Sequence, residues 1–293
     1  MRRALLWLPI ALALGLSGCD LKPRDRVQIT LPATLKEVSG LAVAGPNSVF
    51  THNDEHAIVF EVDIRRGRTL RVFALGDPTI EGDFEGIAAA GDLLFLITSD
   101  GLLYETRPGR HGDRVDYRVF DTGIGPRCEI EGLSQAPERD HLLILCKRFR
   151  GDEGAKRLDI YRWAIGGQRR LETETPWLSV PLDAIMPEDQ QDGFRPSGLE
   201  WDASTGRLLI VSARDRMMVA IDEKGEPVAT VRLAAGRHPH TEGIAVMPDG
   251  RVVLADEGSD TRKGRLSVYE RQVFSSLPSS DSSLEISSKK SSR

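Results

Sequence analysis

One short phrase recurs five times along the chain and constrains its fold more than any other feature. The phrase is a small or acidic residue, a glycine and an apolar residue, followed by a turn and an apolar strand. It occurs at residues 39–41, 85–87, 131–133, 197–199 and 242–244, so successive glycines lie 46, 46, 66 and 45 residues apart. A period of this size without helical periodicity indicates an array of four-stranded units. We therefore predict an all-β, five-bladed β-propeller.

The strand pattern within the units also predicts how the ring closes. In the second unit, apolar runs at 86–90, 93–98, 102–106 and 117–121 are separated by Gly-, Asp- and Pro-rich turns. The fifth unit has three such runs, at 244–247, 252–255 and 266–270. The run at 27–31 supplies the missing outer strand, and its pairing with the fifth unit would remove the open edges. The 66-residue interval is longer than the others, and we attribute its excess to loops around 150–156 and 187–194. A six-bladed ring, with a further blade in that interval, is the alternative.

The N-terminus predicts a targeting segment. Arg2 and Arg3 precede an apolar run at 4–16 that is too short to span a bilayer, and Leu-Ser-Gly-Cys follows at 16–19. This resembles the lipobox of bacterial lipoproteins, which implies cleavage before Cys19 and acylation of that cysteine, with palmitate among the acyl chains. An ordinary secretory signal that happens to contain Cys19 is the alternative. By the same resemblance, Asp20 favours the inner membrane, with the protein facing the periplasm.

The expected domain organisation follows from these features. Residues 1–18 form a lipoprotein signal peptide, 19–25 a lipidated linker, 26–272 the propeller and 273–293 a Ser-rich disordered tail. The chain has 39 Lys and Arg against 44 Asp and Glu without a basic stripe, which excludes nucleic acid as an expected partner. Cys128 and Cys146 flank Pro137 at equal distances, so they can face each other across a hairpin as a disulfide, or remain two buried thiols.

Three of the five phrases carry an acid before the glycine: Glu85, Glu131 and Glu242. In a propeller these positions converge on one axis, where three carboxylates repel one another unless a cation or a proton joins them. Oxygen ligands suit Ca²⁺, so we predict a calcium site at these residues. Ser39 and Ser197 occupy the two other positions, and Glu37 and Glu200 lie nearby in sequence. The alternative is structural, with Gly for close packing and Glu bonding a backbone N–H.

Polar residues at the ends of the second strands form a second candidate set. Asn53, Asp54, Asp256 and Glu257 are the possible additional binding residues, although turn chemistry also favours Asn and Asp there. His238, His240 and Glu242 alternate along the approach to the fifth phrase. In an extended chain they would share one face and could hold a transition metal, or they belong to a solvated loop.

The phrases EVSGLAV, THNDEH, EGIAAAGD and HTEGIAV…DGRVVLADEG resemble the SdiA-regulated family of bacterial propellers, which is related to esterase-like and NHL-type propellers. The resemblance covers most of residues 30–270. It implies a five-bladed propeller, a secreted or membrane-anchored location and a calcium ion, and it supports Glu85, Glu131 and Glu242 as the acidic positions. Ser39 and Ser197 depart from the acidic version.

Two hypotheses of function follow. The first is a lipid-anchored, calcium-binding, non-catalytic module for a periplasmic protein, glycan or small molecule. The second is a metal-dependent hydrolase of phosphodiesters, esters or lactones, in which a bound cation would generate hydroxide and His240 or Asp256 would act as base. No G-x-S-x-G nucleophile elbow and no phosphate-binding Gly loop is present in the sequence.

Overall fold

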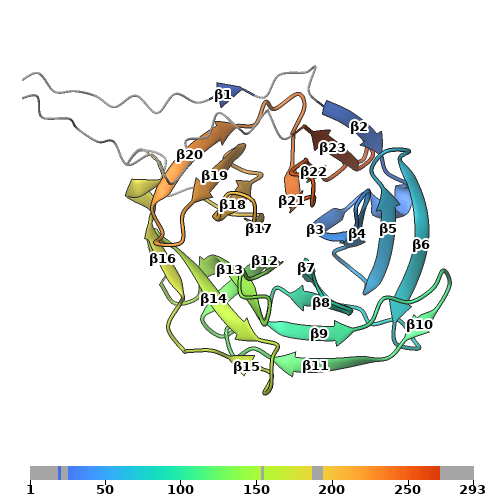
Figure 1. Cartoon of the computed structure of the whole chain (residues 1–293), viewed down its shortest axis with the longest axis horizontal. Helices are drawn as coiled ribbons and strands as arrows, with labels where there is room; N and C mark the ends of the chain where they lie inside the picture. Colours follow the sequence, from blue (N-terminus) through green and yellow to red (C-terminus); the bar gives the residue numbers. More distant parts are fainter. Residues whose placement is uncertain (1–18, 21–25, 153–154, 187–193, 271–293) are drawn as a thin grey trace, which may run out of the picture.

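The computed structural model describes residues 19–20, 26–152, 155–186 and 194–270. In this part of the chain, five sheets surround one axis, each antiparallel in its four main strands, which confirms the five-bladed β-propeller (Figure 1). The predicted signal peptide (1–18) and the tail from residue 273 lie outside the described residues. Among those that are described, no helix is long and apolar enough to cross a membrane.

The strands of each blade follow one another in sequence from the axis outward. Blade I contains β3 (Val38–Gly45), β4 (Ser48–Asn53), β5 (Ile58–Asp63) and β6 (Arg68–Leu75). Blade II contains β7 (Phe84–Ala90), β8 (Leu93–Thr98), β9 (Leu102–Thr106) and β11 (Tyr117–Asp121). Blade III contains β12 (Cys128–Gln135), β13 (His141–Phe149), β14 (Arg157–Ala164) and β16 (Leu178–Pro181). Blade IV contains β17 (Gly198–Asp202), β18 (Arg207–Ser212), β19 (Met217–Ile221) and β20 (Pro227–Arg232).

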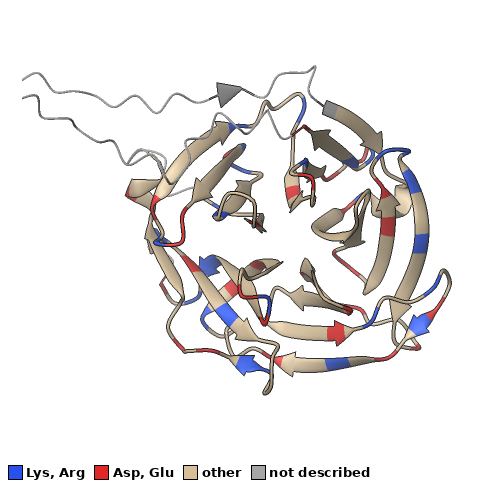
Figure 2. Ribbon diagram, viewed as in Figure 1, with Lys and Arg blue, Asp and Glu red and all other residues tan. Residues whose placement is uncertain are grey.

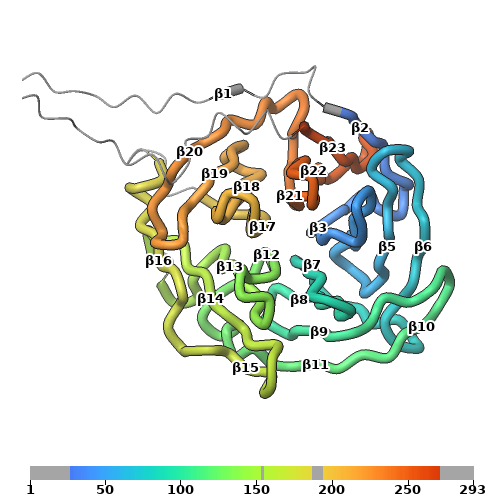
Figure 3. Tube along the Cα trace, viewed as in Figure 1, coloured from blue at the N-terminus to red at the C-terminus, as the bar shows by residue number. Residues whose placement is uncertain are grey.

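Blade V joins the two ends of the propeller. It contains β21 (Thr241–Val246), β22 (Val252–Asp256) and β23 (Arg265–Tyr269), and its outer strand is the N-terminal β2 (Arg26–Thr30). β2 pairs antiparallel to β23 with Gln28 opposite Ser267. The blue and red ends of the trace therefore lie side by side (Figure 3). The predicted closure by residues 27–31 is confirmed, and it satisfies edges that would otherwise be open.

Three short strands extend the blades. β10 (Arg114–Val115) pairs parallel to β6 and so carries the chain of blade II onto the rim of blade I. β1 (Cys19–Asp20) pairs parallel to β20, and β15 (Arg170–Leu171) pairs antiparallel to β14. The segment with β15 absorbs part of the long interval, at a place where the sequence had not predicted the excess. Two loops were expected in this interval, around 150–156 and 187–194. Residues 153–154 of the first and 187–193 of the second lie outside the described residues. Short 3₁₀ turns at Ala33–Leu35 and Leu182–Ala184 complete the elements.

The hydrophobic core lies between adjacent blades, because both faces of each sheet are covered by neighbours. One cluster, for example, joins Leu143 and Ile160 of blade III to Leu199 and Ile210 of blade IV. The innermost strands approach so closely that the repeated glycines have no room for a side chain. A Cβ at Gly86 would lie 2.7 Å from the Leu133 backbone nitrogen of the next blade. These contacts leave a space of only about 10 Å³ on the axis at the glycines, which narrows the axis there to about the size of one water molecule.

Candidate functional site

The three glutamates before the glycines lie at one end of the axis because all five innermost strands begin there. In β7, β12 and β21 the pairing skips the glutamate: Gly86 follows Phe84 in the register, and the same break occurs at residues 131 and 242. Glu85, Glu131 and Glu242 are thus each the extra residue of a β-bulge. A bulge re-aims the side chain of its extra residue, which is how a strand whose faces are both buried can turn a carboxylate toward the axis.

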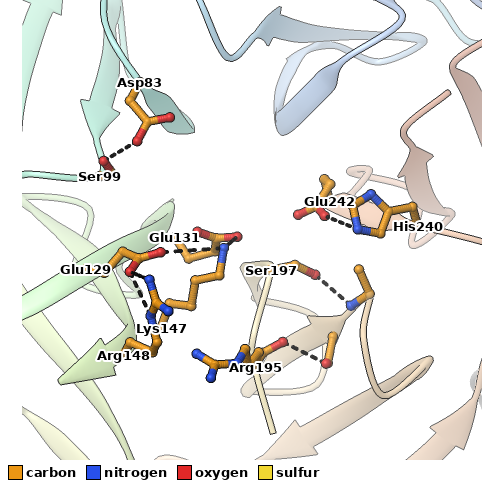
Figure 4. A network of polar contacts seen from close by, with 12 residues as sticks. Asp83, Ser99, Glu129, Glu131, Lys147, Arg148, Arg195, Ser197, His240 and Glu242 are labelled. Atoms are coloured by element: carbon orange, nitrogen blue, oxygen red, sulfur yellow. Dashed lines mark hydrogen bonds and ion pairs between the residues drawn. The ribbon is translucent and has the colours of Figure 1, made fainter. Parts of the chain in front are cut away.

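Lys147, at the end of β13, lies among these carboxylates, and we call Glu85, Glu131, Glu242 and Lys147 the acidic mouth. Its Nζ donates to Oε1 of Glu131 at 2.6 Å and lies 3.9 Å from Oε1 of Glu129 (Figure 4). The other oxygen of Glu131, Oε2, is buried without a hydrogen-bond partner. The ammonium therefore neutralises part of the negative charge and leaves one carboxylate oxygen of Glu131 unsatisfied.

Burial and mutual repulsion favour the protonated forms of the three glutamates in the acidic mouth. Burial, and then the charge of Glu131, raise the pKa of Glu85 far above its usual range. Burial raises the pKa of Glu131 against the opposing effect of Lys147, and burial with Glu131 raises that of Glu242 to about 8. Burial would lower the pKa of Lys147, but Glu131 and the other two acids raise it instead. An additional cation among these groups would stabilise their ionised forms.

His240 connects the acidic mouth to the end of β22. Its Nε2 lies 3.4 Å from Oε1 of Glu242 (Figure 4). Its Nδ1 contacts the carboxylate of Glu257. The hydrogen bond that the imidazole donates to Glu257 raises the pKa of His240. Metal sites in proteins use His, Cys, Asp and Glu side chains. Within the described part of the chain, one group of three such side chains has ligand atoms that all lie within 4.8 Å of one another: His240, Glu242 and Glu257. Glu85 and Glu131 are not in that group, so the predicted triad surrounds the axis without converging on one point.

Two of the candidate site residues, His238 and Asp256, are buried inside blade V. His238, which is 1% exposed, contacts Oδ2 of Asp256 at 2.8 Å and the Tyr269 hydroxyl at 2.5 Å. Asp256 is fully buried and also accepts a hydrogen bond from Thr241. The prediction that His238 and His240 share one face of an extended chain is therefore wrong. β21 begins only at Thr241, and the two rings on the turn before it have different partners. Asp256 is a structural acid that holds this turn, and it is not accessible as a base.

Asn53 and Asp54 end the second strand of blade I, beside the acidic mouth. The Asn53 amide oxygen accepts from the His56 N–H at 3.3 Å, and the Asp54 carbonyl accepts from the Phe84 N–H at 2.7 Å. Burial raises the pKa of Asp54, and the charges of Glu37 and Glu257 raise it further. Asn53 therefore holds the turn after β4, and Asp54 joins blade I to blade II. The acids that surround the axis are seen among the inner strands in Figure 2, while both signs of charge occupy the outer strands.

The serine positions are structural. The Ser197 hydroxyl donates to the Thr241 carbonyl at 2.6 Å, which ties blade IV to blade V, and it accepts from the Ala213 N–H. Ser39 is buried, and its carbonyl accepts from the Thr51 hydroxyl. Cys128 and Cys146 form the predicted disulfide. Because Cys146 precedes Lys147, the bond helps to fix the strand end from which the lysine reaches the axis.

Comparisons with known proteins agree with this architecture. Residues 181–273 match the SdiA-regulated family. The SdiA-regulated match covers blade IV and most of blade V, including Glu242, His240 and Glu257, and it bears out the resemblance predicted from the sequence. The family description assigns no chemistry to these residues, so the site is interpreted from its geometry.

Solved structures of similar fold include three enzymes. Glutaminyl cyclase of Myxococcus xanthus has a TM-score of 0.54 at 17% identity, covering 83% of this chain and 93% of that one. A luciferin-regenerating enzyme has a TM-score of 0.52 at 9% identity, covering 83% and 94%. PQQ-bound aldose sugar dehydrogenase of Streptomyces coelicolor has a TM-score of 0.50 at 13% identity, covering 84% and 99%. Similarity at this level establishes the propeller fold, and activity does not transfer with it.

Proposed function

We propose that this SdiA-regulated propeller is a non-catalytic, calcium-binding module of the bacterial cell envelope. The observation that carries the proposal is the buried, unpartnered Oε2 of Glu131 beside two further acids whose pKa values are raised. A hard cation at Oε2 of Glu131 would satisfy this atom, and the ionised carboxylates of Glu85 and Glu242 around the axis would add to its attraction. Lys147 would remain on the other oxygen of Glu131 and limit the affinity.

The location forms part of the same proposal. The sequence at 16–19 supports acylation of Cys19, and β1 (Cys19–Asp20) runs along β20 at the rim of blade IV. A lipid at this point would tether the disc by its edge, so that both ends of the axis stay accessible to a periplasmic protein, glycan or small molecule. Incorporation of labelled palmitate into the wild type, with none into Cys19→Ser, is the expected result. Equal labelling of both proteins would contradict the tether.

Calorimetric titration of the metal-free full chain carrying Cys19→Ser tests the cation site. One equivalent of Ca²⁺ is expected to bind. Glu85→Gln and Glu242→Gln are expected to weaken binding at least about tenfold, since each removes a charge from the site. The control is Glu223→Gln, at an exposed turn position after β19, which should titrate as the wild type does. Absence of binding at millimolar Ca²⁺, or equal affinity in all four proteins, would refute the calcium proposal.

A second candidate, a metal-dependent hydrolase, is favoured by one observation. His240, Glu242 and Glu257 offer a nitrogen and two oxygens within 4.8 Å, a donor set that suits zinc and similar ions better than calcium. His240→Ala separates the two candidates, because it should abolish Zn²⁺ binding and leave Ca²⁺ binding intact. Turnover of phosphodiester, ester or lactone substrates by the Zn²⁺-loaded wild type, absent in His240→Ala, would favour the hydrolase.

A further inference from the structure

A second site lies at the end of the axis opposite the acidic mouth. There the innermost strands end around a cavity of about 320 Å³. All five blades contribute to its wall, through residues 41–43, 87–89, 134–137, 200–204 and 246–248. The constriction at the repeated glycines separates this axial cavity from the acidic mouth.

Most residues in the wall of the axial cavity are apolar, but β17 also contributes two carboxylates, Glu200 and Asp202. Oε2 of Glu200 accepts from the Ser134 hydroxyl at 2.8 Å, and Oε1 is 3.4 Å from the Val246 backbone nitrogen. The Ser134 hydroxyl in turn accepts from the Trp201 N–H at 3.1 Å. The carboxylate is thus held in place by neighbouring blades, and its Oε1 has a long, weak contact and capacity for another donor.

Glu200 has no cationic partner among the residues that the structure describes. No basic nitrogen there lies within 4.0 Å of its carboxylate. The other charged groups of the wall are Asp202 and Arg139. Asp202 accepts hydrogen bonds from Ser204 and Thr205, and Arg139 is exposed at the rim. Burial, against the hydrogen bonds that it accepts, raises the pKa of Glu200 to about 7. A desolvated carboxylate of this kind gains most from a ligand that brings its own positive charge.

We propose that the axial cavity binds a small organic ammonium ion, with its nitrogen on the Glu200 carboxylate and its apolar body against the alanines of β3 and β7. The volume lies at the lower end of the range for small-molecule sites, about 300–1,000 Å³, so the ligand is a small monoamine. An ammonium supplies donors for Glu200 and a charge that favours its ionised form. A carboxylate ligand would be repelled, and an alcohol would contribute one hydrogen bond without charge.

Three probes with the same six-carbon chain test the charge requirement: hexylamine, hexanol and hexanoate. They are titrated at pH 8 by calorimetry into the full chain carrying Cys19→Ser. Hexylamine is expected to bind at least about tenfold more tightly than hexanol, and hexanoate more weakly than either. Glu200→Gln should remove the preference for hexylamine over hexanol. Ala89→Leu, which narrows the cavity without a change of charge, should weaken both hexylamine and hexanol.

Two results would overturn the proposal. The first is equal binding of hexylamine and hexanol by the wild type, or an unchanged preference in Glu200→Gln. The second is loss of hexylamine binding in Glu242→Gln, because the amine would then occupy the acidic mouth. If Glu242→Gln retains hexylamine binding and Glu200→Gln loses the preference for hexylamine, the amine is assigned to the axial cavity. This outcome does not depend on calcium, so the two proposals fail separately.

Discussion

Substitution of Glu200 by Gln should change how stability depends on pH. The pKa of this carboxyl is raised from 4.5 to about 7 by burial in the wall of the axial cavity. Below pH 4.5 the group is protonated in the folded and the unfolded chain. Between 4.5 and 7 only the unfolded chain releases the proton, so the free energy of unfolding of the wild type falls as pH rises. Above pH 7 the carboxyl is ionised in both states, and its effect on the free energy of unfolding no longer changes with pH.

The size of the loss follows from the shift in pKa. A tenfold change in proton affinity corresponds to about 1.4 kcal/mol, which gives an upper value of about 3 kcal/mol for Glu200. Relaxation around the charge reduces this, and we expect about 1 to 3 kcal/mol. Relative to the wild type, Glu200→Gln should therefore gain this amount between pH 4.5 and pH 8. The other acids with raised pKa values act in the same direction in both proteins and cancel in the difference.

The measurement is urea unfolding at several pH values between 4.5 and 8, followed by tryptophan fluorescence. Glu223→Gln is the matched control, since the same chemical change at an exposed turn should leave the pH dependence of the wild type unaltered. A difference between wild type and Glu200→Gln that stays constant across this range would refute the reasoning. It would mean that water or a cation neutralises the desolvation of the carboxylate.

Three further changes test the architecture, two by thermal or urea unfolding and one by sedimentation. Gly86→Ala places a Cβ 2.7 Å from a backbone nitrogen and should destabilise by about 2 kcal/mol or more, whereas Gly236→Ala, in open space, should be nearly neutral. A neutral Gly86→Ala would contradict the tight axial packing. Reduction of Cys128–Cys146, which closes a loop over a separation of 18 residues, should cost about 3 kcal/mol, and an unchanged midpoint would argue against it. Deletion of Arg26–Thr30 should open the ring and cause self-association in sedimentation, and a stable monomer would count against closure.

Much of the fold follows from the sequence because the repeats encode it. The run predicted at 93–98 coincides with β8, and the closing strand lies where residues 27–31 predicted it. The short strands β10 and β15 were missed, since pairs of two residues carry no apolar pattern of their own. They form where a neighbouring strand already offers an unpaired edge.

The candidate site was less predictable, because it depends on register and on side-chain reach. Pattern alone places Glu131 in a strand, but only the pairing with β13 shows that it is the extra residue of a bulge. Nothing in the sequence position of Lys147 reveals that its long side chain crosses to Glu131. Glu200 follows Ser197 closely in sequence but lies toward the other end of the axis, since a strand rises about 3.3 Å per residue.

The junction of β2 with β23 also has a temporal consequence for the newly made polypeptide. β2 is synthesised before β3 to β22, and its partner β23 (Arg265–Tyr269) is synthesised after them. Until that partner arrives, blade V is incomplete and the flanks of its neighbours are uncovered. Non-local pairing of this kind is slow, and the waiting chain is vulnerable to aggregation and proteolysis. Protection of a newly synthesised molecule from aggregation and proteolysis therefore depends on the pairing of β23 with β2.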